Sequence, residues 1–274
     1  MTGASSGIGE ATALHLAGLG YRVLAGVRST ADFERLRATS PGIEPVMLDI
    51  TNEDHIATLV EFVERSAPGG LAGLVNNAGI ASVGPIEMLS LDEWRAVMDT
   101  NVIGTVAITT ALLPLLFEAR GRIVNISSGA GRIAFPLFGP YASSKFAIEA
   151  FSDVLRREIG EHGVDVVCVE PGVVSSSIFD KNLAASYARA EQQSEAQAGR
   201  YRGLFDSAHR SAEEAGAGGA AAPDTVAPVV AKVLAARRPK ARYAVGWDSR
   251  TAAICARFLP DRLIDLVIRR LTSS

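Results

Sequence analysis

Tyr141 and Lys145 are the residues whose types and spacing most directly suggest proton transfer. They stand four apart in a helical pattern, so both side chains project from one face. An ammonium at Lys145 would favour the phenolate of Tyr141 and bring its pKa, ordinarily about 10, closer to neutral. Ser128, thirteen residues before Tyr141 at a strand end, could hold a substrate oxygen. A tyrosine so placed could give a proton to that oxygen or take one from it.

A glycine-rich segment at the start of the chain, TGASSGIG, has the pattern of a loop that binds a dinucleotide pyrophosphate. Gly3 permits a tight turn, Gly7 lets the backbone approach a phosphate, and Gly9 lets the following helix pack closely. Amide groups at the start of that helix would then meet the anion. The pattern predicts a dinucleotide cofactor.

Arg28 stands nineteen residues past Gly9, at the end of the next predicted strand. An acidic side chain there would bind the ribose hydroxyls of NAD(H), whereas an arginine can pair with the 2′-phosphate of NADP(H). The residue therefore favours NADP(H), with NAD(H) as the alternative. A solvated arginine at a strand end is the competing interpretation.

The elements that must position these residues alternate between apolar runs and helical patterns. Short strands joined by helices predict one doubly wound α/β domain, with a parallel sheet covered on both faces. The predicted strands are 21–27, 44–50, 71–79, 121–128, 164–172 and 242–246, and the principal helices are 29–38, 51–66, 141–160, 224–238 and 260–274.

Two later segments differ from this alternation. Residues 175–222 are polar and alanine-rich, and we interpret 177–222 as a flap over the substrate in preference to a disordered linker. Residues 249–274 are predicted as a helical tail in which leucines and isoleucines alternate with arginines. Such a helix could lie on a membrane surface, but packing on its own domain or on a partner subunit is the favoured interpretation.

Composition narrows the function classes. The chain has 274 residues, of which 48% are hydrophobic and 21% charged, enough for one large core, and its net charge of −3 gives no reason to expect nucleic acid. Cys168 and Cys255 lack metal-type spacing, so we expect no metal site and a reducing, cytoplasmic location. The uncharged run 100–117 is interpreted as a helix buried against the sheet and not as a membrane span.

Taken together, the motifs resemble the short-chain dehydrogenase/reductase family. They are TGASSGIG at 2–9, NNAG at 76–79, TNVIG at 100–104, Ser128, YASSK at 141–145 and PGVVSSS at 171–177. The similarity runs from Thr2 to about Ser176, and segments 121–135 and 148–172 look most like the retinol and hydroxysteroid dehydrogenase branch.

The resemblance implies a role for each matching position. Tyr141 would be the general acid/base, Ser128 would orient the reacting oxygen, Lys145 would also bind the nicotinamide ribose, and Asn101 would hold a water of a proton relay. Asp49 would meet the adenine amino group, Asn76 the adenosine side, and the Pro171–Gly172 turn the nicotinamide. The cofactor-binding set then comprises Gly3, Ser5, Ser6, Gly7, Ile8, Gly9, Arg28, Asp49, Ile50, Asn76, Ala78, Gly79, Tyr141, Lys145, Pro171, Gly172, Val174 and Ser176.

Several of these positions have structural interpretations as well. Asp49 could begin a helix, Asn76 or Asn77 could stabilise a turn, and Asn101 could be a buried polar bridge. Ser127 competes with Ser128, but the thirteen-residue spacing to Tyr141 favours Ser128.

The prediction is an NADP(H)-dependent oxidoreductase that transfers hydride to and from an apolar secondary alcohol or ketone, resembling a steroid, retinoid or lipid. We expect a homodimer or homotetramer. Apolar side chains at Ile133, Phe135, Leu137 and Phe138 favour an apolar ligand. A dinucleotide-binding redox sensor without turnover is the rival, and it is disfavoured because tyrosine and lysine are both present.

The strand that should deliver the glycine loop is missing from the sequence, which begins at Met1. In the doubly wound order that strand lies at the centre of the sheet, between 21–27 and 71–75. We expect the natural chain to extend upstream by about five to ten residues, the length of an ordinary strand.

Overall fold

The computed structural model describes residues 1–175, 177–214, 217 and 219–272, so Ser176 lies outside the described residues. Strands and helices alternate along the chain in the order expected from the sequence. The strands are β1 (Val23–Val27), β2 (Ile43–Met47), β3 (Gly73–Asn76), β4 (Arg122–Ile126), β5 (Asp165–Pro171) and β6 (Arg242–Val245).

The helices connect and cover these strands. The α-helices are α1 (Gly7–Gly18), α2 (Thr30–Thr39), α3 (Glu53–Ser66), α4 (Leu91–Met98), α5 (Gly104–Ala119), α6 (Gly139–Ile159), α7 (Ser177–Glu191), α8 (Glu195–Glu214), α9 (Ala227–Ala235), α10 (Trp247–Phe258) and α11 (Asp261–Thr272). Shorter helical turns are η1 (Ile86–Met88), η2 (Asp99–Ile103), η3 (Gly129–Gly131), η4 (Gly160–His162) and η6 (Pro223–Thr225).

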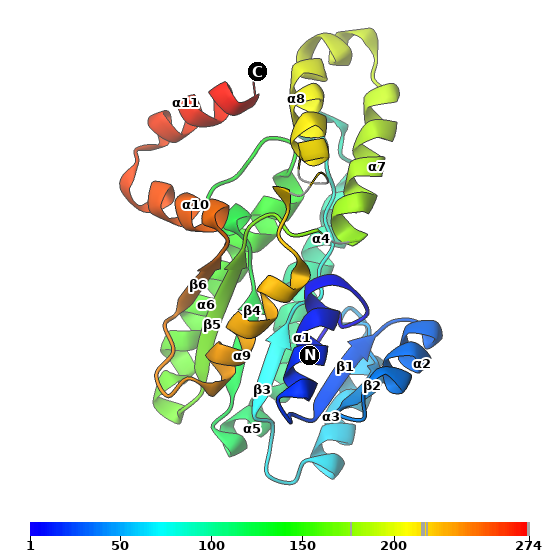
Figure 1. The fold of residues 1–274 in the computed structure, drawn as a ribbon, viewed down its shortest axis with the longest axis vertical. Helices are drawn as coiled ribbons and strands as arrows, with labels where there is room; N and C mark the ends of the chain where they lie inside the picture. The colour runs from blue at the N-terminus through cyan, green and yellow to red at the C-terminus, as the bar shows by residue number, and fades with distance from the viewer. Residues whose placement is uncertain (176, 215–216, 218, 273–274) are drawn as a thin grey trace.

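All strand pairs are parallel, and helices lie on both faces (Figure 1). Helices α1 and α9 cover the face nearer the viewer, and α5 and α6 cover the other (Figure 1). The larger core cluster joins strand residues such as Leu74 and Ile123 to α3, α5 and α6, while two further clusters lie under α1 and α9. The fold is a single doubly wound, Rossmann-type α/β domain, as predicted.

The sheet is divided between β1 and β3, where the sequence analysis expects a further strand. β1 pairs with β2, while β3, β4, β5 and β6 form a separate four-stranded sheet. The backbone of Met1 and Thr2 links the two: Gly26 N donates to Met1 O at 2.8 Å, and Thr2 N donates to Val75 O at 3.0 Å.

Below these two residues, the gap holds a cavity of about 30 Å³ whose walls include Leu24, Leu74 and Ile108. Among the described residues, no other segment takes the central position in the sheet. The sheet thus has the interruption that the sequence predicted.

Helix α5 accounts for most of the apolar run 100–117. Leu91–Ala119 is the one described stretch long and apolar enough to cross a membrane, and 39% of its most apolar window is buried in the protein. Ile108, Leu112 and Leu116 are fully enclosed in the main core cluster. The expected packing of this run against the sheet is therefore present at Ile108, Leu112 and Leu116.

The segment predicted as a flap contains two helices, α7 and α8, joined by a short turn. They project from the same end of the sheet as α10 and α11, which form the predicted helical tail (Figure 1). Helix α11 reaches α8, where Ser207 Oγ donates to Leu271 O at 3.1 Å. Whether 177–222 moves over a substrate stays a prediction.

Candidate active site

Tyr141 and Lys145 lie in the first turns of α6, at the carboxyl end of β4. Pro140 occupies the first turn of the helix, where its missing N–H costs no helical hydrogen bond. The Lys145 ammonium donates to the carbonyl of Ile126, the last residue of β4, at 2.8 Å, and it lies 5.5 Å from the centre of the Tyr141 ring. The expected one-face placement of this pair is therefore present.

The acid–base properties of Tyr141 differ from the expectation. Burial raises the pKa of its hydroxyl above 10.0, and a hydrogen bond with the Ser128 side chain opposes that rise only in part. The pKa of Tyr141 is thus shifted in the direction opposite to the sequence-based expectation, and Tyr141 is protonated at neutral pH.

Burial lowers the pKa of Lys145 from 10.5 to about 8, and the charges of Cys168 and Glu149 oppose that shift. Burial also raises the pKa of the Cys168 thiol to about 12. That thiol is uncharged where Lys145 titrates, so Glu149 is the effective anion beside the ammonium.

Ser128 and Ser127 occupy different environments although they are adjacent. Ser128 follows β4, its hydroxyl accepts from Ala130 N at 3.1 Å, and it hydrogen-bonds Tyr141. Ser127 is buried, and its hydroxyl has no hydrogen-bond partner among the described residues. The geometry favours Ser128 as the residue that shares a substrate oxygen with Tyr141.

Asn101 lies in η2, a π-helical turn between α4 and α5. Such turns often occur at functional sites. Its side chain accepts from Ile80 N at 2.8 Å and donates to Ile80 O and Ser144 Oγ, both at 2.9 Å. Asn101 therefore ties the loop after β3 to α6, which is the buried bridge considered for it. The water relay remains a prediction.

The glycine loop has the tight geometry that its sequence requires. Gly3 and Gly7 have φ values of +61° and +58°, which favour glycine. A Cβ on Gly9 would lie 2.0 Å from the carbonyl oxygen of Gly3, so only glycine fits there. Ser5, Ser6 and Ile8 belong to this same loop and helix start.

Asn77 and Thr2 hold the loop against the end of β3. The Asn77 amide donates to Gly3 O at 2.9 Å, and Thr2 Oγ1 accepts from the backbone N–H groups of Asn77 and Ala78, both at 3.0 Å. Ala78 lies directly against Gly3, and a Cβ on Gly79 would lie 3.2 Å from Asn101 Oδ1. The loop after β3 thus supports the glycine loop, and the sequence analysis gave Asn77 no specific part in this contact.

The side chain of Asn76 lies in the core of the domain. Asn76 is buried, and its amide donates to Thr109 Oγ1 at 2.9 Å and to Asn125 Oδ1 at 2.8 Å. The side chain therefore bonds core groups of α5 and β4, and the expected contact of Asn76 with the adenosine side of the cofactor stays a prediction. Ile50 is likewise buried in the main core, with Gly104 packed against it.

Asp49 and Arg28 lie near each other at the ends of β2 and β1. Asp49 accepts from Thr51 N at 2.9 Å and from Thr51 Oγ1 at 2.7 Å, in a turn just before α3, whose N-cap is Asn52 and not Asp49. Burial raises the pKa of Asp49, but the bonds with Thr51 and the charge of Arg28 lower it further, for a net decrease. Arg28 is exposed just after β1, where an arginine could meet a 2′-phosphate.

Arg35 is a neighbour of the glycine loop that the sequence did not single out. Its guanidinium donates to Ser5 O at 2.6 Å and pairs with Glu10 and Asp32. Arg35 lies on α2, the helix that directly follows Arg28, and this position was the signal in the sequence that could have found it. Because Arg35 is already neutralised by two carboxylates, Arg28 remains the stronger candidate for a phosphate.

Asp248 holds the turn expected to contact the nicotinamide. Its carboxylate accepts from Val173 N at 2.7 Å, and a Cβ on Gly172 would lie 1.9 Å from it. Pro171 ends β5, and Val174 forms an isolated bridge with Ala221. Sequence reasoning missed Asp248, because the contact joins segments 75 residues apart. Ser176 lies outside the described residues.

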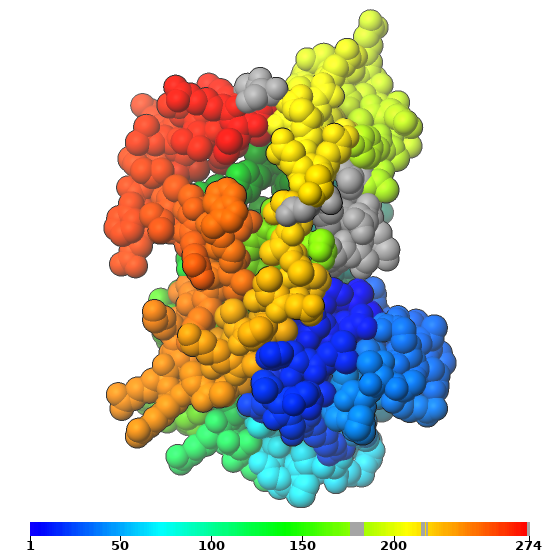
Figure 2. Space-filling view, in the orientation of Figure 1, coloured from blue at the N-terminus to red at the C-terminus, as the bar shows by residue number. Residues whose placement is uncertain are grey.

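A cavity of about 700 Å³ adjoins the start of α6. Figure 2 shows the hollow between α11, in red, and α8, in yellow. Its walls include Trp94, Phe135, Leu137, Phe146 and Ile268, with polar groups at Ser143, Asp265, Arg269 and Thr272.

Two of the four apolar residues expected near a substrate, Phe135 and Leu137, line this cavity. Ile133 is buried, and Phe138 packs in a separate cluster with Val83 and Phe205. Tyr141 and Ser128 do not line it, since Ala142, Ser143 and Phe146 face another side of α6. The cavity is therefore beside the reacting groups.

The residues present fit a nicotinamide dinucleotide. The glycine loop has room for a pyrophosphate only because its glycines have no Cβ atoms to occupy the space. The hydroxyl groups of Ser128 and Tyr141 can both bond a carbonyl or hydroxyl oxygen of a substrate. Among the described residues, no group of three His, Cys, Asp or Glu side chains could hold a metal ion. Fold and site together define a Rossmann-type oxidoreductase.

Comparisons with known proteins identify the family. The model of the short chain dehydrogenase family matches residues 1–186. Human retinol dehydrogenase 5 is 37% identical over 278 residues, covering 98% of this chain and 86% of that protein, and human 17-beta-hydroxysteroid dehydrogenase type 6 is 36% identical, covering 98% and 87%. A solved short-chain dehydrogenase from Streptomyces avermitilis superposes with a TM-score of 0.75 at 27% identity, covering 99% of this chain and 95% of that one.

The chain belongs to the short-chain dehydrogenase family. It is an oxidoreductase that acts on CH–OH groups with NAD(P), and its relatives are of the retinol and hydroxysteroid dehydrogenase branch.

Proposed function

We propose that this protein transfers hydride between NADP(H) and an apolar alcohol or the corresponding ketone or aldehyde, resembling a steroid, a retinoid or another lipid. The observation that carries the proposal is the hydrogen-bonded pair of Ser128 and Tyr141 beside the Lys145 ammonium. The preference for NADP(H) and the apolar substrate rest on further residues.

The chain's own groups supply the proton chemistry. In the reductive direction NADPH supplies a hydride to the carbonyl carbon, and the oxygen requires one proton. Tyr141 is protonated at neutral pH and can donate that proton while the Ser128 hydroxyl holds the same oxygen. The nearby Lys145 ammonium then stabilises the phenolate that remains. Oxidation of an alcohol reverses these steps and requires Tyr141 to be deprotonated first.

The position of Arg28 supports NADP(H). Its positive charge acts on Asp49, so the guanidinium lies near the end of β2, beside the region that we propose for the adenosine ribose. A 2′-phosphate there would gain charge-assisted hydrogen bonds from an arginine.

The large cavity and the relatives' names support an apolar substrate. Aromatic and aliphatic side chains form most of the wall next to the start of α6, and apolar walls favour apolar ligands. The names of the two human relatives refer to retinol and to hydroxysteroids. We assign this cavity to the part of the substrate that extends away from the reacting oxygen.

The test is a kinetic screen of the purified protein with NADPH and with NADH. The substrates are retinal, ketosteroids, medium-chain ketones and small charged keto acids. The proposal expects the highest kcat/KM for a bulky apolar ketone or aldehyde with NADPH. The highest value for a small charged keto acid would refute the apolar assignment, and equal or better use of NADH would refute the NADP(H) assignment.

A pair of variants tests the cavity itself. Ile268 lines it, whereas Leu266 lies two residues away on α11 and is 45% exposed outside it. Ile268→Trp should raise KM for the bulky substrate about tenfold and leave a small ketone unaffected, because one lost apolar contact surface is worth about 1–3 kcal/mol. Leu266→Trp should change neither. Equal effects of the two variants would remove the cavity from the substrate path.

The redox-sensor alternative is not favoured, because a protein that only senses the cofactor has no need of the Ser128–Tyr141 pair. We also propose a cytoplasmic, homo-oligomeric protein. The free Cys168 and Cys255 agree with a reducing compartment, and exposed apolar side chains on α10 and α11 agree with a subunit contact.

A further inference from the structure

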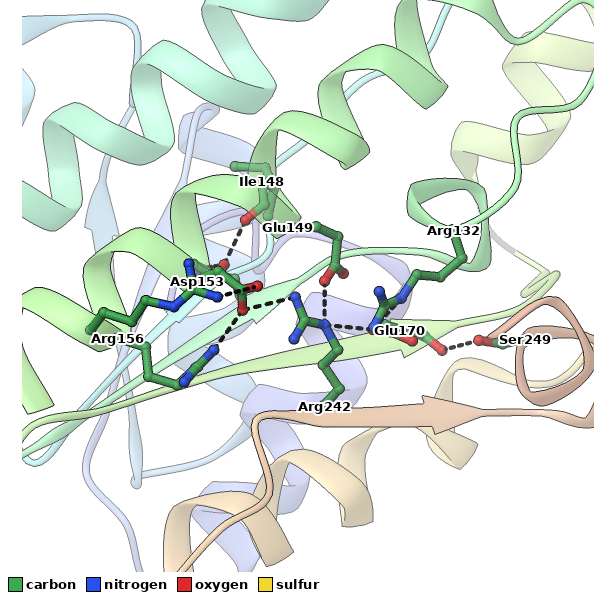
Figure 3. Close-up of polar contacts among 11 residues, drawn as sticks. Arg132, Ile148, Glu149, Asp153, Arg156, Glu170, Arg242 and Ser249 are labelled. Carbon is green, nitrogen blue, oxygen red and sulfur yellow. Dashed lines mark hydrogen bonds and ion pairs between the residues drawn. The ribbon is translucent and has the colours of Figure 1, made fainter. Parts of the chain in front are cut away.

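A cluster of charged side chains lies behind the catalytic face, where α6, β5 and β6 meet (Figure 3). Arg242, the first residue of β6, is at its centre. Its guanidinium donates to Glu149 on α6 at 2.8 Å, pairs with Asp153 at 2.9 Å and lies 3.6 Å from Glu170 of β5. The pairing of β6 with β5 fixes the backbone of Arg242, which lies in register with Cys168.

The two carboxylates nearest the site are deeply buried and depend on these cations. The side chains of Glu149 and Glu170 are 7% and 1% exposed. Arg132 donates to Glu170 at 3.0 Å from the other side, so Glu170 bridges two guanidiniums (Figure 3). A buried carboxylate that loses its cationic partner destabilises the folded protein, because its charge is no longer compensated. The ion pairs therefore fix the positions of Glu149 and Glu170.

Part of the cluster contacts the loop 127–132, which carries Ser128 and is called the serine loop below. Arg132 immediately follows η3, which follows Ser128, so the Arg132–Glu170 bond anchors this loop to β5. The loop also packs closely on α6: a Cβ on Gly131 would lie 3.2 Å from both Lys145 O and Glu149 Cγ. A shift of Glu170 would therefore move the loop that carries Ser128.

Another part of the cluster, Glu149, lies close to Lys145. Glu149 lies one helical turn beyond Lys145, and its negative charge opposes the lowering of the Lys145 pKa by burial. The other titratable groups that face Lys145 are Tyr141, on the same helix, and Cys168 of β5, and both are neutral near pH 8. Glu149 is thus the anion that keeps Lys145 charged.

We propose that Arg242 is a positioning residue for catalysis, which holds Glu149 beside Lys145 and Glu170 beneath the serine loop. This inference rests on the proposed acid–base roles of Ser128, Tyr141 and Lys145. Arg242 acts through Glu149 and Glu170, and it makes β6 a requirement for the geometry of Glu149, 93 positions earlier in the chain.

The structure supplies a control for Arg242. Arg122 of β4 pairs with Asp165 at 2.7 Å and also bonds the carbonyls of Val233 and Leu234. Like Arg242, Arg122 is partly buried and bonds a neighbouring strand, here β5, as well as a helix, α9. It lies at the opposite end of β4 from Ser128. Loss of Arg122 should therefore cost stability without moving the catalytic groups.

The first experiment compares Arg242→Met, Arg242→Lys and Arg122→Met. For Arg242→Met we expect kcat to fall about tenfold or more with NADPH affinity nearly unchanged, because misplacing a catalytic group by about 1 Å can cost about a hundredfold. Arg242→Lys should recover part of the loss, since it restores the charge but not the fork of donors. Arg122→Met should lower Tm and leave kcat unchanged. A kcat for Arg242→Met within twofold of wild type would overturn the proposal.

The second experiment reads Lys145 directly and does not depend on turnover. The chain has four lysines, so the ε-carbon of Lys145 can be assigned and titrated by NMR. Glu149→Gln, which keeps the shape and removes the charge, should move the Lys145 pKa below about 8. Asp153→Asn, one turn further along α6, should leave it where it is. An unchanged pKa in Glu149→Gln, or an equal change in Asp153→Asn, would overturn the proposal.

The two experiments separate this inference from the proposed function. Wild-type protein that reduces none of the screened carbonyl compounds would contradict the function, while the Lys145 titration would still test Glu149. If Arg242→Met does not fold, the isosteric Glu149→Gln carries the kinetic test as well, with an expected loss of kcat above pH 7 that is absent in Asp153→Asn.

Discussion

Two neighbouring hydroxyl groups at the end of β4 have opposite surroundings, and they allow a sharp test at the scale of single residues. The Ser128 hydroxyl is hydrogen-bonded to Tyr141, whereas the Ser127 side chain is buried in the protein. Ser128→Ala should lower kcat about a hundredfold, the cost of removing one donor to a developing oxyanion. Ser127→Ala should leave kcat near wild type, because its hydroxyl reaches no reacting group. A larger loss in Ser127→Ala would transfer the role to that residue.

Tyr141→Phe removes only the ionisable hydroxyl. We expect turnover to fall about 10²–10⁴-fold, the range for general acid–base catalysis, with NADPH binding nearly unchanged. Fluorescence titration with NADPH gives the affinity and a stopped assay gives the turnover. A variant that kept more than a tenth of wild-type turnover would show that Tyr141 is not the proton donor.

Cofactor preference depends on one exposed side chain. Arg28→Asp should weaken NADPH binding tenfold or more relative to NADH, because hydrogen bonds to charged groups are worth about 1.5–3 kcal/mol and an aspartate also repels the phosphate. Arg37→Asp is the matched control: it changes net charge equally, and Arg37 is exposed on α2 with Glu34 as its partner at 2.6 Å. The same change of preference in both variants would indicate a general charge effect.

At the scale of elements, α1 offers two glycines with opposite requirements. A Cβ on Gly9 would clash with Gly3 O, whereas one on Gly18 meets nothing within 4 Å. Gly9→Ala should destabilise the fold by about 1–3 kcal/mol and abolish high-affinity NADPH binding, since the loop must move to accommodate the methyl group. Gly18→Ala should keep binding and gain up to about 1 kcal/mol from helix propensity.

Thermal melting and NADPH titration of the two glycine variants measure both effects. Intact NADPH affinity in Gly9→Ala would mean that the close approach of α1 to the loop is not needed for phosphate binding. A loss of affinity in Gly18→Ala would point to α1 as a whole, and not to the cradle.

At the scale of the whole molecule, α11 exposes a row of apolar side chains. Leu263, Leu266, Val267 and Leu271 are 45–64% exposed, and Phe258 of α10 adds to them. Such a surface is commonly covered by another subunit. We expect wild-type protein to be oligomeric by light scattering and the double variant Leu266→Glu/Val267→Glu to form smaller species.

Liposome sedimentation tests the alternative for the same surface. Wild-type protein is expected to stay in the supernatant, and the glutamate variant serves as the control. Sedimentation of wild type alone would assign α11 to a membrane surface, in contradiction to the subunit contact.

Much of the fold was accessible from the sequence because its signals are local. Apolar runs and caps such as Ser29, which accepts from Asp32 N, located the strands and helices to within a few residues. The two helices of 177–214 were underestimated. Their polarity suggested a flap or linker, but the alanine, glutamate and arginine residues that fill them are strong helix formers, and that signal was available.

The sequence by itself determined which residues could do chemistry and that they share one end of a parallel sheet. Helical periodicity placed Tyr141 and Lys145 on one face, and strand ends located Ser128, Arg28 and the glycine loop. These conclusions need only spacing along the chain.

Only the tertiary structure decided which way side chains point and how they ionise. Asn76 and Asn77 are adjacent and identical in type, yet one bonds the core and the other the glycine loop. The pKa of Tyr141 rises where the local pattern suggested a fall, because burial depends on everything packed around the hydroxyl. Arg242 reaches Glu149 across 93 residues, and no local pattern contains that contact, since it forms only when β6 pairs with β5.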